Sequence, residues 1–221
     1  MSIQLSEIAM TLRERMASGQ RDFSDLNCVG GELARIDLSG ATFSNCNFDG
    51  ADLTAAKLAD SIWKRCRAQG ATLRAVDAES TRFTNCNLAN IDWSGARLAS
   101  ASFEDCKLTG GDFRDSKVLG ITFKNVQLVS ALIRGISFRR QTLDGIDFTS
   151  ADLGGADFRE CILVDCRLNG ASLRGARFAG ADLRGCDLGE IGLTEAAIFK
   201  GAVISRGQAT ELLRGFGLTV V

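Results

Sequence analysis

Six cysteines recur at multiples of twenty residues, and this spacing is the first pattern in the sequence that could carry chemistry. They are Cys46, Cys66, Cys86, Cys106, Cys166 and Cys186. Thiolates held close together bind metal ions or exchange disulfides. A straight line of thiols, however, cannot provide the tetrahedral ligands that zinc requires, and parallel stacked side chains lack the dihedral angle of a disulfide. We interpret these cysteines as small buried core residues and expect no metal and no cofactor.

A second set of recurring residues is acidic: Glu32, Asp52, Asp92, Asp112 and Asp152 also share one position of a twenty-residue period. Paired carboxylates can act as general acid and base. The chain has no histidine, and it has neither a glycine-rich phosphate loop between a strand and a helix nor a nucleophile elbow. We therefore predict that the protein is not an enzyme and that these five carboxylates are candidates for binding a partner.

Both sets belong to a shorter period of five residues. From Phe23 to Val203, every position ending in 3 or 8 is Leu, Ile, Val, Phe or Trp, except Cys28, Ala68 and Ala78. We name this residue the central residue; the residue two positions before it is nearly always small or apolar. Side chains two apart in an extended chain point the same way, so each unit predicts a short strand with one buried face.

The fifth position of each unit must turn a corner. Of the 36 corner positions from Asp25 to Lys200, fourteen are Gly and four are Asn, residues that tolerate a positive φ. Strands joined by corners wind a coil that buries its interior only when coils stack on one another. The chain contains no Pro, which agrees with stacking through parallel hydrogen-bond ladders that need every backbone donor.

These units resemble the pentapeptide-repeat family, whose units have the form A(D/N)LxG. The segments that carry the resemblance are ADLTA (51–55), IDWSG (91–95), GDFRD (111–115), ADLGG (151–155), ADFRE (156–160) and ADLRG (181–185). The resemblance implies an all-β solenoid, a right-handed quadrilateral β-helix with twenty residues per coil. It extends over residues 21–204, which would make about nine coils.

The N-terminal segment, residues 1–20, is predicted to be a helical cap. A helix over residues 6–17 would begin at Ser6 as N-cap and stop at Gly19. Its apolar stripe consists of Leu5, Ile8, Ala9, Leu12 and Met16.

The C-terminal segment, residues 205–221, is predicted to be a second cap with an apolar tail. Ser205 and Gln208 form a capping-box pattern, and the helix should end at Gly215. We predict a homodimer through this segment, because its apolar residues would remain exposed in a single chain. The candidate interface residues are Leu212, Leu213, Phe216, Leu218, Val220 and Val221.

Composition limits the remaining classes of function. Lys and Arg total 26 against 27 Asp and Glu, so we expect no direct binding to nucleic acid. The sequence contains no run of 18 apolar residues, so we predict no membrane span. We also do not expect the first twenty residues to be a signal peptide. With eight cysteines and no secretion signal, we predict reduced thiols and a cytoplasmic protein.

The resemblance also implies a function. Some members of the family bind DNA gyrase, with a rod that imitates duplex DNA, and protect the enzyme from quinolones. A rod of about 43 Å that copied duplex DNA would carry on the order of 25 charges, more than this balanced surface provides. Two hypotheses remain: binding to DNA gyrase or topoisomerase IV through the five carboxylates, or a rigid structural or interaction module with an unknown partner.

Overall fold

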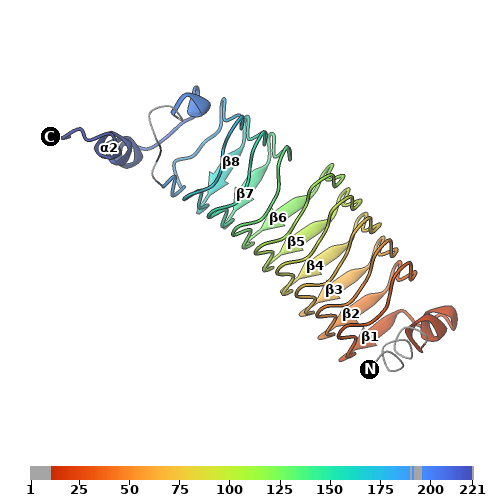
Figure 1. The fold of residues 1–221 in the computed structure, drawn as a ribbon. Coiled ribbons are helices and arrows are strands. Elements are labelled where there is room, and N and C mark those ends of the chain that lie inside the picture. Colours follow the sequence, from red (N-terminus) through yellow and green to blue (C-terminus); the bar gives the residue numbers. More distant parts are fainter. Residues whose placement is uncertain (1–10, 190, 192–195, 221) are drawn as a thin grey trace. The chain divides into compact units, whose positions relative to one another are not determined.

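The computed structural model describes residues 11–189, 191 and 196–220. It is a parallel β-solenoid of stacked four-sided coils, as the five-residue period predicts, and it divides into two compact units (Figure 1). The N-terminal unit ends at Val126 and the C-terminal unit begins at Gln127. This boundary falls inside an unbroken five-residue phase, so the sequence pattern, which predicts no domain break, does not mark it.

The N-terminal unit contains six three-residue strands that pair in parallel, in chain order and without a shift in register. They are β1 (Asp22–Ser24), β2 (Thr42–Ser44), β3 (Ile62–Lys64), β4 (Arg82–Thr84), β5 (Ser102–Glu104) and β6 (Thr122–Lys124). The other three sides of each coil pair through single bridge residues, such as Asn27 with Asn47. Each strand therefore pairs with the residues twenty positions later, which fixes the twenty-residue coil.

The C-terminal unit contains β7 (Thr142–Asp144) and β8 (Ile162–Val164), which also pair in parallel, followed by η1 (Ala196–Phe199) and α2 (Arg206–Gly215). The solenoid makes about seven turns, fewer than the nine expected. Strands β1 to β8 recur every twenty residues, and the regular coil stops before residue 203.

Corner residues confirm the predicted turns. Each fifth residue from Asp25 to Gly180 has a positive φ, and nineteen of these residues are not Gly. Even Arg35, with φ of 58°, takes this conformation, because the buried residues on both sides of the corner leave the chain no alternative.

Stacking of like residues forms the core of the N-terminal unit. Phe23 and Phe43 stack at 5.2 Å between ring centroids, and Phe83 and Phe103 at 4.9 Å. Trp63 lies between the two pairs, 4.6 Å from Phe43 and 5.8 Å from Phe83. All five side chains are at most 2% exposed, as the alternation of the sequence predicts.

The five-residue phase fails at its C-terminal end. Val203 bridges Asp182, not Leu183, and it is 48% exposed although the pattern predicts it to be buried. Gly185 lacks the positive φ that the pattern predicts for it, whereas Gly189, one residue before the next corner position, has one. Phe199, which lies outside the phase, instead covers the core by contacting Phe178 at 4.8 Å between centroids.

Helical segments cap the described ends of the two units. Residues 11–17 are helical and bury Leu12 and Met16 over the first coil, whereas the predicted N-cap Ser6 and the rest of the apolar stripe lie outside the described residues. The helix stops before Gly19, which has the expected positive φ of 90°. No helix within the described part of the chain combines the length and hydropathy needed to cross a bilayer.

The C-terminal helix begins as predicted, with Ser205 as its N-cap. Ser205 and Gln208 make the capping box of α2, and the helix ends at Gly215 with Phe216 as C-cap. The left-handed residue that follows is Gly217, with φ of 77°; Gly215, which we expected to end the helix in this way, is still helical.

Candidate partner-binding surface

Four of the five predicted carboxylates occupy one column of the N-terminal unit, which we name the acidic column: Glu32, Asp52, Asp92 and Asp112. Bridge pairs run from Glu32 to Asp52, through Thr72 to Asp92, and on to Asp112. Each residue precedes a buried central residue, so its side chain points away from the core. The structure therefore brings these carboxylates together on one outer side, one coil apart except at Thr72.

Asp152, the fifth predicted carboxylate, belongs to the C-terminal unit. There it bridges Leu132 on one side and Ser172 on the other, so it has no carboxylate neighbour in its own column. Arg134 lies 3.3 Å from its carboxylate. Asp152 is therefore not part of the acidic column of the N-terminal unit.

Arginines neutralise one end of the acidic column. Arg114 forms a bidentate contact with Asp112, with an N–O distance of 2.5 Å, and this hydrogen bond holds the pKa of Asp112 below its usual value. Arg74 lies 3.7 Å from Asp92. Glu32 and Asp52 are exposed and form no ion pair with other described residues, so the net negative charge of the column lies at its N-terminal end.

Most of the Asp residues before central residues also serve the local backbone. The Oδ1 of Asp52 accepts a hydrogen bond of 2.9 Å from the amide of Thr54, and Asp92 accepts the same bond from Ser94. Asn47 makes the equivalent bond with the amide of Asp49. This Asx turn explains why Asp and Asn recur at this position. The turn could have been inferred from the sequence, because each of these residues lies just before the turn that ends its unit.

The six cysteines at multiples of twenty residues, from Cys46 to Cys186, are buried as predicted, and we name them the thiol column. All eight cysteines are free and buried, and each member of the predicted column is at most 7% exposed. The Cys86 Sγ lies 3.4 Å from the carbonyl oxygens of Trp63 and of Thr84, either of which can accept its one hydrogen. Contact with the Cys106 thiol, together with burial, raises the pKa of Cys86 to about 12. Within the described residues no cluster of three potential ligands could hold a metal ion.

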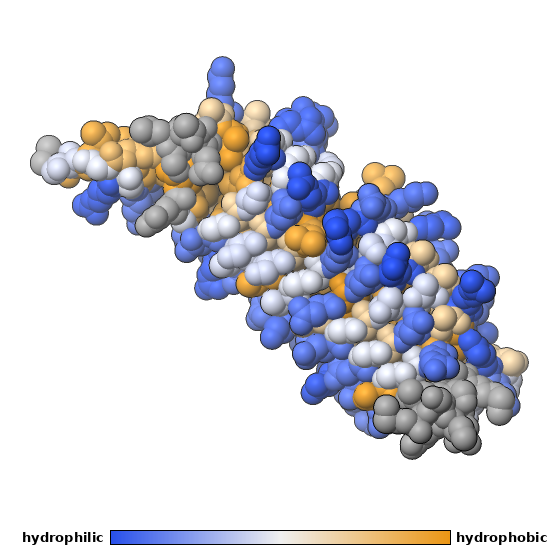
Figure 2. Space-filling model, viewed as in Figure 1, coloured by the Kyte–Doolittle hydropathy of each residue, from blue (hydrophilic) through white to orange (hydrophobic). Residues whose placement is uncertain are grey.

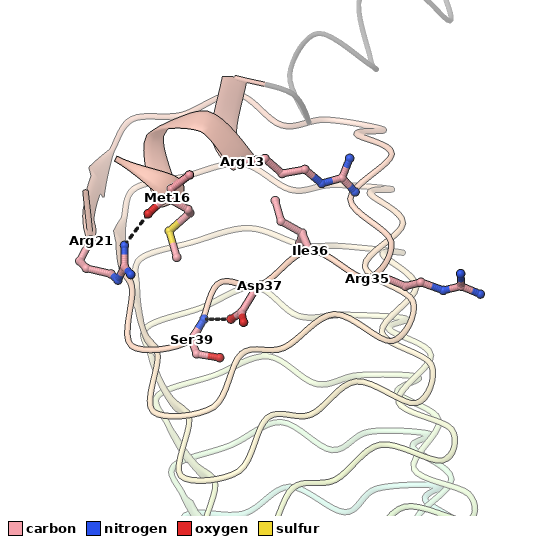
Figure 3. A pocket seen from close by; sticks show the side chains of 8 residues that line it. Arg13, Met16, Arg21, Arg35, Ile36, Asp37 and Ser39 are labelled. Atoms are coloured by element: carbon pink, nitrogen blue, oxygen red, sulfur yellow. Dashed lines mark hydrogen bonds between the residues drawn. The ribbon is translucent and has the colours of Figure 1, made fainter. Parts of the chain in front are cut away.

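A pocket of about 530 Å³ between the N-terminal helical residues and the first coil was not anticipated from the sequence (Figure 3). Arg13 and Arg21 line it, yet both serve the fold: Arg13 donates to the carbonyl of Ala34, and Arg21 to that of Met16. Arg35 projects outward from its corner (Figure 3). The pocket thus marks where the helical cap is fastened to the first coil.

Apolar residues of the predicted dimer interface are accessible at the C-terminal end. Leu213, Leu218 and Val220 are 39%, 54% and 37% exposed, while Leu212 and Phe216 are half-buried. Figure 2 shows apolar atoms gathered over this end of the C-terminal unit, whereas single apolar residues are scattered elsewhere on the same view. Val221 lies outside the described residues.

Solved structures of one protein share this fold. They are structures of QnrB1, which is described as a plasmid-mediated fluoroquinolone resistance protein. The full-length form has a TM-score of 0.78 and 19% identity, covering 89% of this chain and 100% of QnrB1. Two trypsin-treated forms have TM-scores of 0.79 and 0.68, with 20% and 22% identity. Each alignment covers 90% of this chain, and it covers 100% of the first QnrB1 form and 99% of the second. No curated protein sequence matches the chain.

Family models match most of the chain. Residues 22–60, 123–159 and 151–189 match pentapeptide repeats, and residues 57–133 match the pentapeptide repeat region. The matches follow one another through the whole regular part of the solenoid, including the coils with the acidic and thiol columns. The chain therefore belongs to the pentapeptide-repeat family.

Proposed function

We propose that this protein works by binding and not by catalysis, and that its partner is a type II topoisomerase, DNA gyrase or topoisomerase IV, which it protects from quinolones. The observation that carries this proposal is the common fold with QnrB1, a fluoroquinolone resistance protein, over nearly the full length of both chains. The absence of histidine from the sequence and the exposed carboxylates agree with binding through the outer surface.

The acidic column is the proposed contact. A topoisomerase binds the phosphates of duplex DNA with a basic surface, and exposed carboxylates at coil spacing, about 4.8 Å, can occupy the same surface. Duplex DNA carries about one charge per 1.7 Å, so four carboxylates, two of them ion-paired, imitate it only in part. We therefore assign the main contact to Glu32 and Asp52, since no arginine among the described residues forms an ion pair with either of them.

The test is a gyrase supercoiling assay with and without a quinolone, at several salt concentrations. Addition of the protein should inhibit supercoiling or protect against the drug, and the effect should weaken as salt screens the contact. Asp52→Lys should abolish the effect and keep the coils folded, because the side chain is exposed and the substitution removes one hydrogen bond, from the Thr54 amide. Asp22→Lys is the matched control, since Asp22 is also exposed and also precedes a central residue, but on another side of the coil.

Failure in this assay would end the topoisomerase proposal. A protein that neither inhibits supercoiling nor protects against the drug would leave only a rigid interaction module with a different partner. Equal losses in Asp52→Lys and Asp22→Lys would remove the acidic column as the contact, even if the topoisomerase still bound.

We further propose that the chain forms a homodimer through its C-terminal tail. The exposed Leu213, Leu218 and Val220 would be buried on both chains by one two-fold contact. Light scattering should give twice 23.6 kDa, and deletion of residues 216–221 should give a monomer. Because α2 is fixed to the last coil through Gln208, this deletion should leave the cap in place. A full-length chain that remains monomeric at high concentration would refute the dimer.

A further inference from the structure

Charge in the C-terminal unit is segregated by side, although the chain as a whole is balanced. The sides centred on β7 and β8 and on the bridge residues Asp147 and Arg167 carry five carboxylates and two arginines over the outward residues of 142–150, 162–170 and 182–189. The two other sides, formed by outward residues of 132–140, 152–160 and 172–180, carry six arginines and three carboxylates. We name these two sides the arginine face; its charge is three positive, and the opposite sides are three negative.

All the cations of the arginine face are arginine, and most are held in place by carboxylates. They are Arg134, Arg139, Arg140, Arg159, Arg174 and Arg177. The buried carboxylate of Asp157 binds Arg159 at 2.7 Å and Arg177 at 3.0 Å, and Glu160 binds Arg139 and Arg140, both at 2.7 Å. One carboxylate between two guanidinium groups fixes both groups and still leaves one net positive charge.

A bare ridge divides the arginine face. The corner residues between its two sides are Gly135, Gly155 and Gly175, stacked in successive coils. An ideal Cβ on Gly175 would lie 3.9 Å from the Cα of Gly155, and one on Gly155 would lie 4.0 Å from the Cα of Gly135. No side chain projects from the ridge, so a ligand can approach the backbone with arginines on both flanks.

We propose that the arginine face binds the phosphate backbone of duplex nucleic acid without reading its sequence. Two flanking rows of guanidinium groups can meet the two phosphate rows that border a groove, while the glycine ridge enters the groove. The surface is polar and positive, as interfaces with DNA are. The protein–protein alternative fits less well, because Leu132, half-buried, is the one large apolar outward residue of this face, and none is aromatic.

Salt dependence gives the expected magnitude. Three net charges that displace counterions from three phosphates predict a slope of about −2.7 for the logarithm of affinity against the logarithm of salt concentration. Raising salt from about 50 to about 200 mM should then weaken binding about 40-fold. Arg174 is exposed and has no ion pair within the described residues, so its removal leaves no carboxylate without a partner. Arg174→Gln should reduce the loss to about 12-fold.

The experiment is fluorescence anisotropy of a labelled duplex DNA of about 20 base pairs, titrated with the full chain at several salt concentrations. Arg167→Gln is the control, because it removes an arginine from the opposite, negative sides of the same unit, where it pairs with Asp147 at 3.3 Å. The proposal predicts that Arg174→Gln weakens binding and lowers the slope, whereas Arg167→Gln leaves both unchanged. Asp52→Lys should not weaken DNA binding, so this proposal and the topoisomerase proposal fail independently.

Three results would overturn the proposal. The first is no binding to the duplex at about 50 mM salt. The second is an equal effect of Arg174→Gln and Arg167→Gln, which would mean that the contact is not on the arginine face. The third is displacement of the DNA by poly-glutamate at equal charge concentration, which would make an acidic polypeptide the better partner.

Discussion

Gln208 fastens the C-terminal helix to the solenoid, and its removal should detach that helix without unfolding the coils. Its side chain is buried, and its Nε2 donates hydrogen bonds of 2.7 Å to the carbonyl oxygens of Leu183 and Cys186. Its Oε1 accepts from the amide of Ser205 in the capping box. One side chain thus satisfies two carbonyls at the end of the regular coil and one amide at the start of α2.

The magnitude follows from these contacts. Gln208→Ala takes the Gln208 donor from the Cys186 carbonyl, at about 1–3 kcal/mol, and removes half of the capping box, at about 1 kcal/mol. The Leu183 carbonyl keeps its second hydrogen bond, from the Cys186 amide. We expect a loss of about 2–4 kcal/mol in the stability of the docked helix. Gln208→Glu keeps the acceptor for the Ser205 amide but cannot donate to the carbonyls, so we expect it to lose nearly as much as Gln208→Ala.

Hydrogen exchange measured by mass spectrometry separates local from global effects. Amides of residues 205–216 should exchange at least about 30-fold faster in both variants, while those of residues 131–160 should remain protected. Thr210→Ala is the control, because its hydroxyl bonds only the exposed turn of α2 and should cost less than about 0.5 kcal/mol. Unchanged protection in both variants would refute the reasoning. Loss in Gln208→Ala alone would assign the anchoring to the capping box and not to the two carbonyls.

Three further predictions concern the coils. Cys86→Ala should lower the free energy of unfolding, measured with denaturant, by about 1 kcal/mol. In the native protein the thiols should react slowly with a thiol reagent, because Cys86 is buried and has a pKa of about 12. Fast labelling of the thiol column would contradict this expectation. Gly40→Ala should destabilise the fold by about 1 kcal/mol, because φ at residue 40 is +66° and no atom lies within 4 Å of the new Cβ, so backbone strain is the cause. Ala55→Gly, at the same kind of corner, should not destabilise the fold. Equal losses of stability in the two variants would show that φ is not the cause. The hydrogen bond from Arg159 lowers the pKa of Asp157 to about 2, so the ionised carboxylate stabilises the fold fully above its unfolded pKa of about 4. The difference in unfolding free energy between the unsubstituted protein and Asp157→Asn should therefore shrink as the pH falls from about 4 to about 2. A difference that stays constant over that range would contradict the ion pair.

The regular coils could be predicted from the sequence because each residue of the unit has one physical role. Central residues fill the core, the residues two before them are small, and the fifth residue turns, so the position of Arg35 alone predicts its positive φ. The capping box of Ser205 and Gln208 was visible for the same reason, since its signal is local.

The end of the solenoid could not be predicted in this way. Val203 has the residue type and phase of a core position, yet it is exposed, because the last bridge forms one residue out of phase with Asp182. The chain closes the core with Phe199 on Phe178, a contact between residues that no five-residue period relates. Closing the last coil depends on three-dimensional fit, whereas the interior coils depend on repetition.

Net charge was a poor guide to the surface for a related reason. Averaging over the whole chain gives a balance of 26 to 27, and averaging each side along the full solenoid also hides the excess of arginine in the C-terminal unit. The opposed charges become visible only when the residues of one side are counted within one unit. An expectation of no nucleic-acid binding that rests on net charge therefore does not exclude a contact on the arginine face.

The local role of Asp narrows the residues that can carry recognition. Asp52 and Asp92 are needed by their own turns, since each accepts the amide two residues later, so their presence does not by itself indicate a partner. Glu32 differs, because none of the side chain–backbone bonds found for its Asp neighbours is formed by its longer carboxylate, and no arginine neutralises it among the described residues. Its charge serves neither the turn nor an ion pair within the chain. Of the acidic column, Glu32 is therefore the residue whose identity the fold explains least and a binding partner would explain best.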